Sequence, residues 1–144
     1  MAYLLDTNVL SELVRPTPDA IVVAWARNLP ALDQYVSVLT LGEIEKGIAL
    51  MSTGARRTQL MEWARAALPR QFLGRTLQIE DDIAVTWGQL TAAGKASGRE
   101  LPVIDGLLVA TAKVHGLTLA TRNVSDVVNR GVSVFDPWTG VLHP

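Results

Sequence analysis

The sequence predicts a single α/β domain in which a mostly parallel central sheet is flanked by helices. Three observations indicate this fold class. The chain has 144 residues, a length typical of one domain. Short apolar runs without polar alternation recur along it, as expected of strands buried on both faces. Segments with helical spacing of apolar residues lie between these runs, and such alternation is typical of a parallel sheet. We therefore expect residues 1–144 to form one domain.

Composition excludes several classes of protein. Cysteine is absent, which excludes disulfide scaffolds, cysteine nucleophiles and thiolate metal sites. Two histidines, His115 and His143, are too few for a histidine-rich metal site. The formal net charge of −1 does not indicate nucleic-acid binding by itself, so such binding would need a local basic patch. No run approaches the roughly 18 apolar residues of a membrane helix, and Asp6 interrupts the N-terminal apolar run. We expect a cytoplasmic protein without a membrane segment.

The first strand is expected at residues 3–5, an apolar run too short for a helix. Thr7 and Asn8 are typical N-cap residues, and we expect them to open a short helix over residues 9–14. Pro16 would end this helix, because the residue before a proline disfavours helical geometry.

A second helix is expected to follow directly and to end near residue 29. Thr17 would cap it, Pro18 would occupy its first position and Asp19 would be an acid of its first turn. Residues 35–38 are apolar enough for a second strand.

The middle of the chain predicts three helices and one strand. Thr40 and Glu43 have the spacing of a capping box, which would start the third helix of the chain. Residues 54–68 carry apolar side chains at helical spacing. A strand is expected at residues 76–79, followed by a long helix over residues 80–98 with three acids in its first turn.

The C-terminal third predicts one long helix and two strands. The helix covers residues 102–116 and carries Asp105 in its first turn. The strands are expected at residues 117–120 and 132–135, with a short helical segment containing Asp126 between them. The remaining residues are expected to form a tail.

Four acids lie at junctions between predicted strands and helices, namely Asp6, Glu43, Asp105 and Asp126. Active sites of parallel sheets lie beyond the carboxyl ends of the strands, so these acids are expected to converge. Two unit charges about 4 Å apart repel by about 4 kcal/mol at an effective dielectric constant near 20, so a cluster of this kind needs cations. Oxygen ligands suit Mg²⁺ or Mn²⁺. The matching chemistry is metal-assisted hydrolysis of a phosphodiester bond.

Each acid except Asp6 also has a purely structural interpretation. Glu43 could serve only the capping box, Asp105 could complement a helix dipole, and Asp126 could cap a short helix. Asp6 is harder to explain by packing, because a carboxylate rarely follows an apolar strand for that purpose. The acids at residues 80–82 are expected to be surface residues.

Arginine and tryptophan leave further alternatives open. Arg122 lies beside the expected site and could contact a phosphate or pair with a neighbouring acid. Arg56 and Arg57 could steer a nucleic acid, but a solvated helix face explains them better. The tryptophans within helical patterns are expected in the core or an interface rather than as platforms for bases, and they are Trp25, Trp63 and Trp87.

Five blocks in order along the chain resemble one known family. They are LLDTNVLS from residue 4, LTLGEIEKGI from residue 39, VIDGLLVATA from residue 103, LTLATRN from residue 117 with Asp126 after it, and VFDPW from residue 134. Together they resemble the PIN-domain ribonucleases and, more narrowly, the VapC toxins and their FitB-like subgroup. The blocks cover nearly the whole chain, which makes the resemblance specific.

The resemblance implies a role for eight residues. The four acids Asp6, Glu43, Asp105 and Asp126 match the metal-site positions of the family. Supporting polar positions, which orient the acids or water around them, are matched by Thr7, Asn8 and Thr121, with Asn123 as a further contact near Asp126. Arg122, beside the expected site, is the candidate contact to RNA on the chemistry of its side chain rather than on the resemblance.

The resemblance also implies a function and partners. The expected activity is endoribonucleolytic hydrolysis of RNA that depends on Mg²⁺ or Mn²⁺. Proteins of this kind are typically homodimers and the toxins of type II toxin–antitoxin pairs, each held by a cognate antitoxin protein. DNA would be contacted only indirectly, through the antitoxin.

Two other functions remain open from the sequence. The chain could be a catalytically silent PIN scaffold that binds RNA or a protein partner, although a pure binder would not need four repelling acids. It could also transfer phosphoryl groups through an aspartyl phosphate at Asp6. A haloacid-dehalogenase-like pattern would place a second aspartate two residues later, where this chain has Asn8.

Overall fold

The first strand of the chain lies in the middle of the sheet. The computed structural model describes residues 1–144. The strands, in chain order, are β1 (Tyr3–Leu5), β2 (Gln34–Ser37), β3 (Thr76–Leu77), β4 (Thr118–Ala120), β5 (Val134–Asp136) and β6 (Val141–His143). Their order in the sheet is β3-β2-β1-β4-β5-β6. Every neighbouring pair is parallel except β5 with β6, which confirms the predicted mostly parallel α/β architecture.

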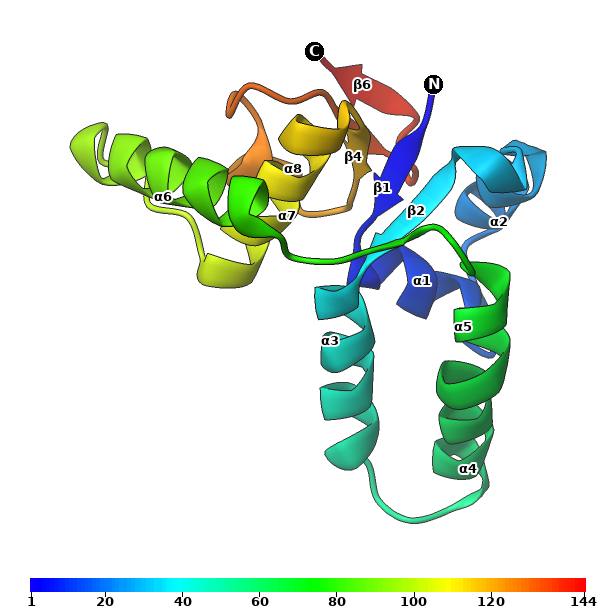
Figure 1. Cartoon of the computed structure of the whole chain (residues 1–144). Coiled ribbons are helices and arrows are strands. Elements are labelled where there is room, and N and C mark those ends of the chain that lie inside the picture. The colour runs from blue at the N-terminus through cyan, green and yellow to red at the C-terminus, as the bar shows by residue number, and fades with distance from the viewer.

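Helices follow the strands along the chain, and some pack against the sheet while others extend away from it (Figure 1). They are α1 (Thr7–Leu13), α2 (Ala20–Asn28), α3 (Val38–Ala49), α4 (Ala55–Glu62), α5 (Leu68–Gln71), α6 (Asp81–Ala96), α7 (Val103–His115) and α8 (Val124–Val127). A 3₁₀ turn, η1 (Ala31–Asp33), precedes β2, and a π-helical turn, η2 (Trp63–Ala67), joins α4 to α5. Helix α6 packs along α7, while α3 runs beside the arm formed by α4, η2 and α5 (Figure 1). None of the helices has the length and apolar character needed to cross a membrane.

The N-caps of α1 and α2 differ from those predicted. Asp6, rather than Thr7 or Asn8, caps α1, and its Oδ1 accepts a hydrogen bond from the Thr7 backbone N–H at 2.7 Å. Helix α2 begins after Asp19, whose carboxylate accepts from two backbone N–H groups at 2.8 and 3.2 Å. The expected cap at Thr17 and first-turn position of Pro18 were therefore wrong. In both cases a carboxylate, which is a strong N-cap group, caps the helix in place of the nearby residue that was expected to do so.

The predicted capping box at Thr40 was also wrong. Helix α3 starts directly after β2, and the Ser37 hydroxyl accepts from the Leu39 backbone N–H at 3.1 Å. Thr40 and Glu43 therefore lie inside the helix, one turn apart on the same face. The capping interpretation of Glu43 does not apply.

Two further elements were missed. The helix predicted over residues 54–68 extends to Gln71 and contains the π-helical turn η2. The expected C-terminal tail instead includes β6, which returns antiparallel to β5 after a turn in which Gly140 has a φ of +73°. That backbone conformation favours glycine.

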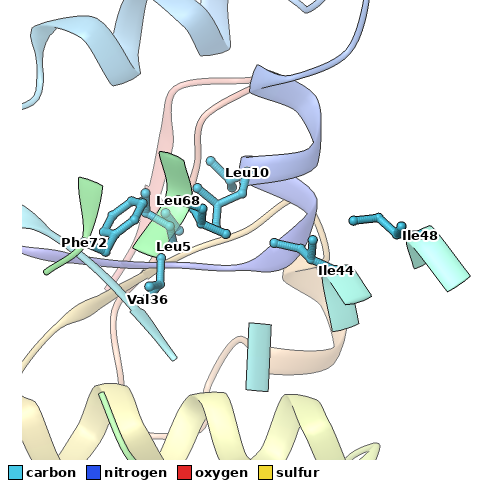
Figure 2. Close-up of a cluster of buried hydrophobic side chains, with 9 residues drawn as sticks. Leu5, Leu10, Val36, Ile44, Ile48, Leu68 and Phe72 are labelled. Carbon is cyan, nitrogen blue, oxygen red and sulfur yellow. The ribbon is translucent and has the colours of Figure 1, made fainter. Parts of the chain in front are cut away.

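The core lies on both faces of the sheet. Figure 2 shows one cluster, which joins Leu5 of β1 and Ile44 of α3 with Leu68 of α5 and with Phe72, the residue that follows α5. Phe72 is fully buried, and burial of such a side chain contributes about 1.5–3 kcal/mol of stability. The other cluster packs α7 against the opposite side, with Leu108 and Val109 among its members. These clusters fix the strand ends from which the polar residues of the site project.

Candidate functional site

Asp6 is the central carboxylate of a polar group at the carboxyl ends of β1 and β4. Leu5 pairs with Ala120 in the sheet, so the next residues, Asp6 and Thr121, leave it side by side. The Asp6 Oδ2 atom accepts a hydrogen bond from the Thr121 hydroxyl at 2.7 Å and one from the Asn8 side-chain amide at 3.3 Å. Because Oδ1 caps α1, both oxygens of this carboxylate, which is only 8% exposed, are held in place.

Glu43 is positioned by a hydroxyl from α1. The Thr7 Oγ1 atom donates to Glu43 Oε1 at 2.6 Å. It also lies 3.2 Å from the hydroxyl of Thr40, a fully buried residue on α3. The contact with Thr40 was not anticipated as part of the site. Its signal was present in the sequence, because a threonine three residues before Glu43 shares its helix face.

Asp105 is connected to Asp6 through two polar residues of the β4–α8 loop. The Asn123 side-chain amide donates to Asp105 Oδ2 at 3.2 Å. The Asn123 backbone N–H donates to the Thr121 hydroxyl at 3.0 Å, and that hydroxyl in turn donates to Asp6. Asn8 donates to the same hydroxyl at 3.1 Å. Thr121 therefore connects segments that are more than a hundred residues apart in the sequence.

Asp126 lies at the margin of this group. It is exposed on α8, and its charge raises the pKa of Asp105. The structure thus brings together Asp6, Glu43 and Asp105 through hydrogen-bonded neighbours, whereas Asp126 acts on them through its charge.

The electrostatics of the site disfavour the ionised forms of Asp6 and Asp105. Burial raises the pKa of Asp6, with a smaller contribution from the charge of Glu43, against the opposing hydrogen bonds from Thr121 and Thr7. Burial raises the pKa of Asp105 to about 6, and the charges of Asp6, Asp126 and Glu43 add to this effect. The two ion pairs of the structure, Arg15 with Glu12 and Arg65 with Glu45, include none of the four acids. The acids therefore repel one another without a compensating cation from the chain.

The donor set is of the chemical type that a hard cation binds. It consists of carboxylate oxygens flanked by hydroxyl and amide groups, the ligands preferred by Mg²⁺ and Mn²⁺. No three His, Cys, Asp or Glu side chains are arranged so that they could hold a metal ion. Mg²⁺ usually keeps several of its waters, so it needs few direct protein ligands. Burial is the main cause of the raised pKa of Asp105, and the charges of Asp6, Asp126 and Glu43 add to it; a bound cation would relieve this added repulsion.

Arg122 follows Thr121 in the same loop. Its backbone N–H donates to Asn8 Oδ1 at 3.3 Å, and its guanidinium lies 5.1 Å from the centroid of the Trp138 ring. Its side chain pairs with no acid and is exposed. Arg56 and Arg57 differ from the predicted solvated face, because they donate to the backbone carbonyl groups of Val14 and Ile48.

Comparison with known proteins gives consistent results. The model of the family described as PIN domain matches residues 3–125. The chain is 39% identical over 135 residues to Toxin FitB of Neisseria gonorrhoeae, covering 94% of this chain and 97% of that protein. It is 35% identical over 134 residues to VapC ribonuclease Y4jK of Sinorhizobium fredii, covering 93% and 96%. A solved structure of FitAB bound to an IR36 DNA fragment has a TM-score of 0.89 at 38% identity, over 94% of this chain and 95% of that one.

Proposed function

The chain belongs to the PIN-domain family, and we propose that it is a metal-dependent endoribonuclease that acts as the toxin of a toxin–antitoxin pair. One observation carries this proposal. Three acids from three separate segments are held at one edge of a parallel sheet by hydroxyl and amide groups, without a cation from the chain. Clustered carboxylates that repel one another do not stabilise a fold. They are expected where a site binds a cation and a phosphodiester. The names of the relatives, a toxin and a ribonuclease, support the same activity.

The residues have separate tasks in this proposal. Asp6, Glu43 and Asp105 would together hold Mg²⁺ or Mn²⁺, at least in part through its coordinated waters because no three acids are arranged to ligate it directly, with Asp126 assisting by its charge. When bound, the cation would activate water and stabilise the leaving oxygen of the phosphodiester. Thr7 holds the orientation of Glu43, and Thr121 and Asn8 hold that of Asp6. Asn123 does the same for Asp105.

Arg122 would contact the RNA backbone. Its exposed guanidinium is steadied by the Trp138 ring and lies in the loop that also carries Thr121. Guanidinium groups bind phosphate oxygens through two parallel hydrogen bonds, which would position the chain of phosphates beside the acids.

We further propose a cognate antitoxin and a second copy of the chain as protein partners. The similarity to Toxin FitB over nearly its whole length supports the antitoxin, because a toxin of this type is paired with one. The FitAB structure with a DNA fragment supports a complex that contacts DNA, and we propose that the antitoxin makes this contact. Large apolar side chains that are more than half exposed are compatible with protein interfaces, and they include Leu32, Leu50, Leu73, Val85 and Val103.

The test is cleavage of defined RNAs by wild type and by Glu43→Gln, with Mg²⁺, with Mn²⁺ and with a chelator. The protein should first be separated from any co-purified partner, and RNA binding should be measured in parallel. We expect cleavage by wild type with metal only, and no cleavage by the variant. RNA binding by wild type without cleavage under any condition would contradict the proposal and favour a catalytically silent scaffold.

A further inference from the structure

Two arginines meet beyond the margin of the acids, where no carboxylate pairs with them. The Arg130 Nη1 atom donates to the Arg99 carbonyl at 2.7 Å, and its Nε atom donates to the Asp126 carbonyl at 3.3 Å. The Arg99 Nη2 atom donates to the Val128 carbonyl at 3.1 Å. The two side chains therefore join the loop after α6 to the segment after α8.

The backbone at Arg99 is fixed by the end of α6. Gly98 has a φ of +71°, and the Arg99 N–H donates to the Gly94 carbonyl at 2.8 Å, as in a Schellman C-cap. Gly94 is buried, and a Cβ atom there would lie 2.6 Å from the Arg99 carbonyl oxygen and 3.4 Å from Arg130 Nη1. A side chain at position 94 would displace the loop, so glycine allows the two arginines to meet.

The arginine pair carries two positive charges without an anion. Arg99 is exposed and Arg130 is half-buried, and neither forms an ion pair, although Glu100 and Asp126 lie close in the sequence. Burial lowers the pKa of Arg130, and the charge of Arg99 adds to this effect, against the charge of Asp126. The Arg130 Nη2 and Arg99 Nη1 atoms donate to no group of the chain, so they are available to an anion.

Lys113 extends the charge beyond Arg130. Its Nζ atom lies 3.5 Å from the position that a Cβ atom would take at Gly131, the residue after Arg130. Lys113 is exposed and forms no ion pair. Three cations from three segments thus lie together on one surface of the domain.

Asp126 connects this surface to the acids. Its charge contributes to the raised pKa of Asp105, and its backbone carbonyl accepts a hydrogen bond from Arg130. The loop that holds Arg99 also leads directly into α7, which carries Asp105 in its first turn (Figure 1). An anion bound by the arginine pair would therefore lie just beyond the acids.

We infer that Arg99 and Arg130, with Lys113 beside them, bind backbone phosphates of the RNA close to the bond that is cleaved. The inference rests on the proposed ribonuclease function. The acids repel a strand of phosphates, so part of its affinity must come from cations outside the acid site. A guanidinium suits this task because it donates two parallel hydrogen bonds to phosphate oxygens. Such contacts hold the strand without reading its sequence.

The experiment measures binding of labelled single-stranded RNA oligonucleotides over a series of KCl concentrations, with a chelator present so that the RNA stays intact. Wild type is compared with Arg99→Gln, Arg130→Gln and Arg130→Lys. Lysine keeps the charge of Arg130 but cannot bridge two carbonyl groups as a guanidinium does, so it separates charge from support of the loop. Arg27→Gln is the matched control, because Arg27 is exposed on α2 and makes no ion pair.

We expect each of Arg99→Gln and Arg130→Gln to raise Kd about tenfold at the lowest salt concentration, as for one lost charged hydrogen bond. The slope of log K against log[KCl] should become shallower by about 0.7, the value for one lost contact with a single-stranded phosphate. Arg130→Lys should keep the wild-type slope, and Arg27→Gln should keep both slope and Kd. In cleavage with metal, Arg130→Gln should raise KM and leave kcat unchanged, because the arginine pair lies outside the acid site.

Two results would overturn the inference. Unchanged slopes in both glutamine variants would show that the arginines touch no phosphate. Equal changes in Arg130→Gln and Arg130→Lys would show that the bridge only supports the loop. The failure of the proposed function looks different: wild type would bind RNA with the expected salt dependence but cleave none with Mg²⁺ or Mn²⁺.

Discussion

Two buried carboxylates at opposite ends of α1 have opposite surroundings. Glu12, in the last turn, is 4% exposed and accepts a hydrogen bond from the Asp19 backbone N–H at 3.0 Å. That bond and the Arg15 guanidinium lower the pKa of Glu12. Asp6, at the first turn, is 8% exposed and faces Glu43, and its pKa is raised chiefly by burial. One acid is supplied with a cation by the chain, and the other is not.

The difference separates an acid that serves the fold from one that serves function. Burial does not distinguish them, because both are almost fully buried. What differs is the partner. A buried carboxylate with hydrogen bonds and a cation stabilises the folded chain, whereas one placed among like charges opposes folding and is typical of functional sites. Variants at three positions test this comparison, in decreasing order of their expected effect on cleavage.

The largest effect is expected at Asp105, which should behave as Asp6 does. Asp105→Asn should lower kcat/KM for RNA by at least about 100-fold, because loss of a metal-holding carboxylate costs several kcal/mol in the transition state. The amide can still interact with Asn123. Kinetics with saturating Mg²⁺ on one defined RNA would measure the loss, and a loss below a few fold would remove Asp105 from the site.

The same variant should be more stable without metal. The pKa of Asp105 is raised from 3.8 to about 6, so the folded protein holds this proton more tightly than the unfolded chain does. The free energy of unfolding should therefore fall as pH rises from 3.8 to about 6. After allowance for partial exposure to solvent, Asp105→Asn should recover about 1 kcal/mol at pH 7 and nothing at pH 3.5. Denaturant unfolding at both pH values checks this, and destabilisation at pH 7 would contradict it.

A smaller loss of cleavage is expected at Thr7, which positions Glu43 without holding the metal. Thr7→Val removes the hydroxyl that donates to Glu43 at 2.6 Å but keeps the shape of the side chain. We expect kcat to fall about tenfold, the equivalent of one charged hydrogen bond, with little change in KM. Thr7→Ser keeps the hydroxyl and should restore most of the rate. Equal losses in both variants would indicate a packing effect instead.

No loss of cleavage is expected at Glu12, although the fold should weaken. Glu12→Gln removes the charge that pairs with Arg15, so Tm should fall at pH 7 while kcat of the folded protein is unchanged. Because the pKa of Glu12 is lowered from 4.5 in the folded protein, its contribution is present above pH 4.5 and is lost as pH falls below that value. Wild type and Glu12→Gln should therefore converge in Tm in acid. A fall in kcat would break the distinction between the two carboxylates.

Much of the fold and site could be predicted from local patterns. The strand ends at Asp6 and Ala120 were visible as apolar runs that stop at polar residues, and the rule for parallel sheets placed their side chains at one edge. Glu43 and Asp105 could be placed at the same edge because each lies in a predicted helix that adjoins a strand. Their hydrogen-bonded partners could be proposed only through the family resemblance, because contacts such as Thr121 with Asp6 span the chain.

Other features depend on competition that a sequence does not display. Ser37 and Thr40 are both capable N-caps, and the end of β2 decides for Ser37. Strand β6 has three residues and forms only because β5 offers an edge. Arg56 was expected on a solvated helix face, but in the folded chain it donates to the backbone carbonyl of Val14 at the end of α1. In each case tertiary structure chooses between local options of similar free energy.

The most direct measurement is RNA cleavage and unfolding of Asp6→Asn in the same preparation, with and without Mg²⁺ or Mn²⁺. Asparagine caps a helix about as well as aspartate, so the start of α1 should be kept. We predict that metal-dependent cleavage is abolished while the free energy of unfolding without metal is equal to or above that of wild type. Undiminished cleavage by the folded variant would contradict the assignment of Asp6 to the site, and marked destabilisation would show that Asp6, like Glu12, serves the fold.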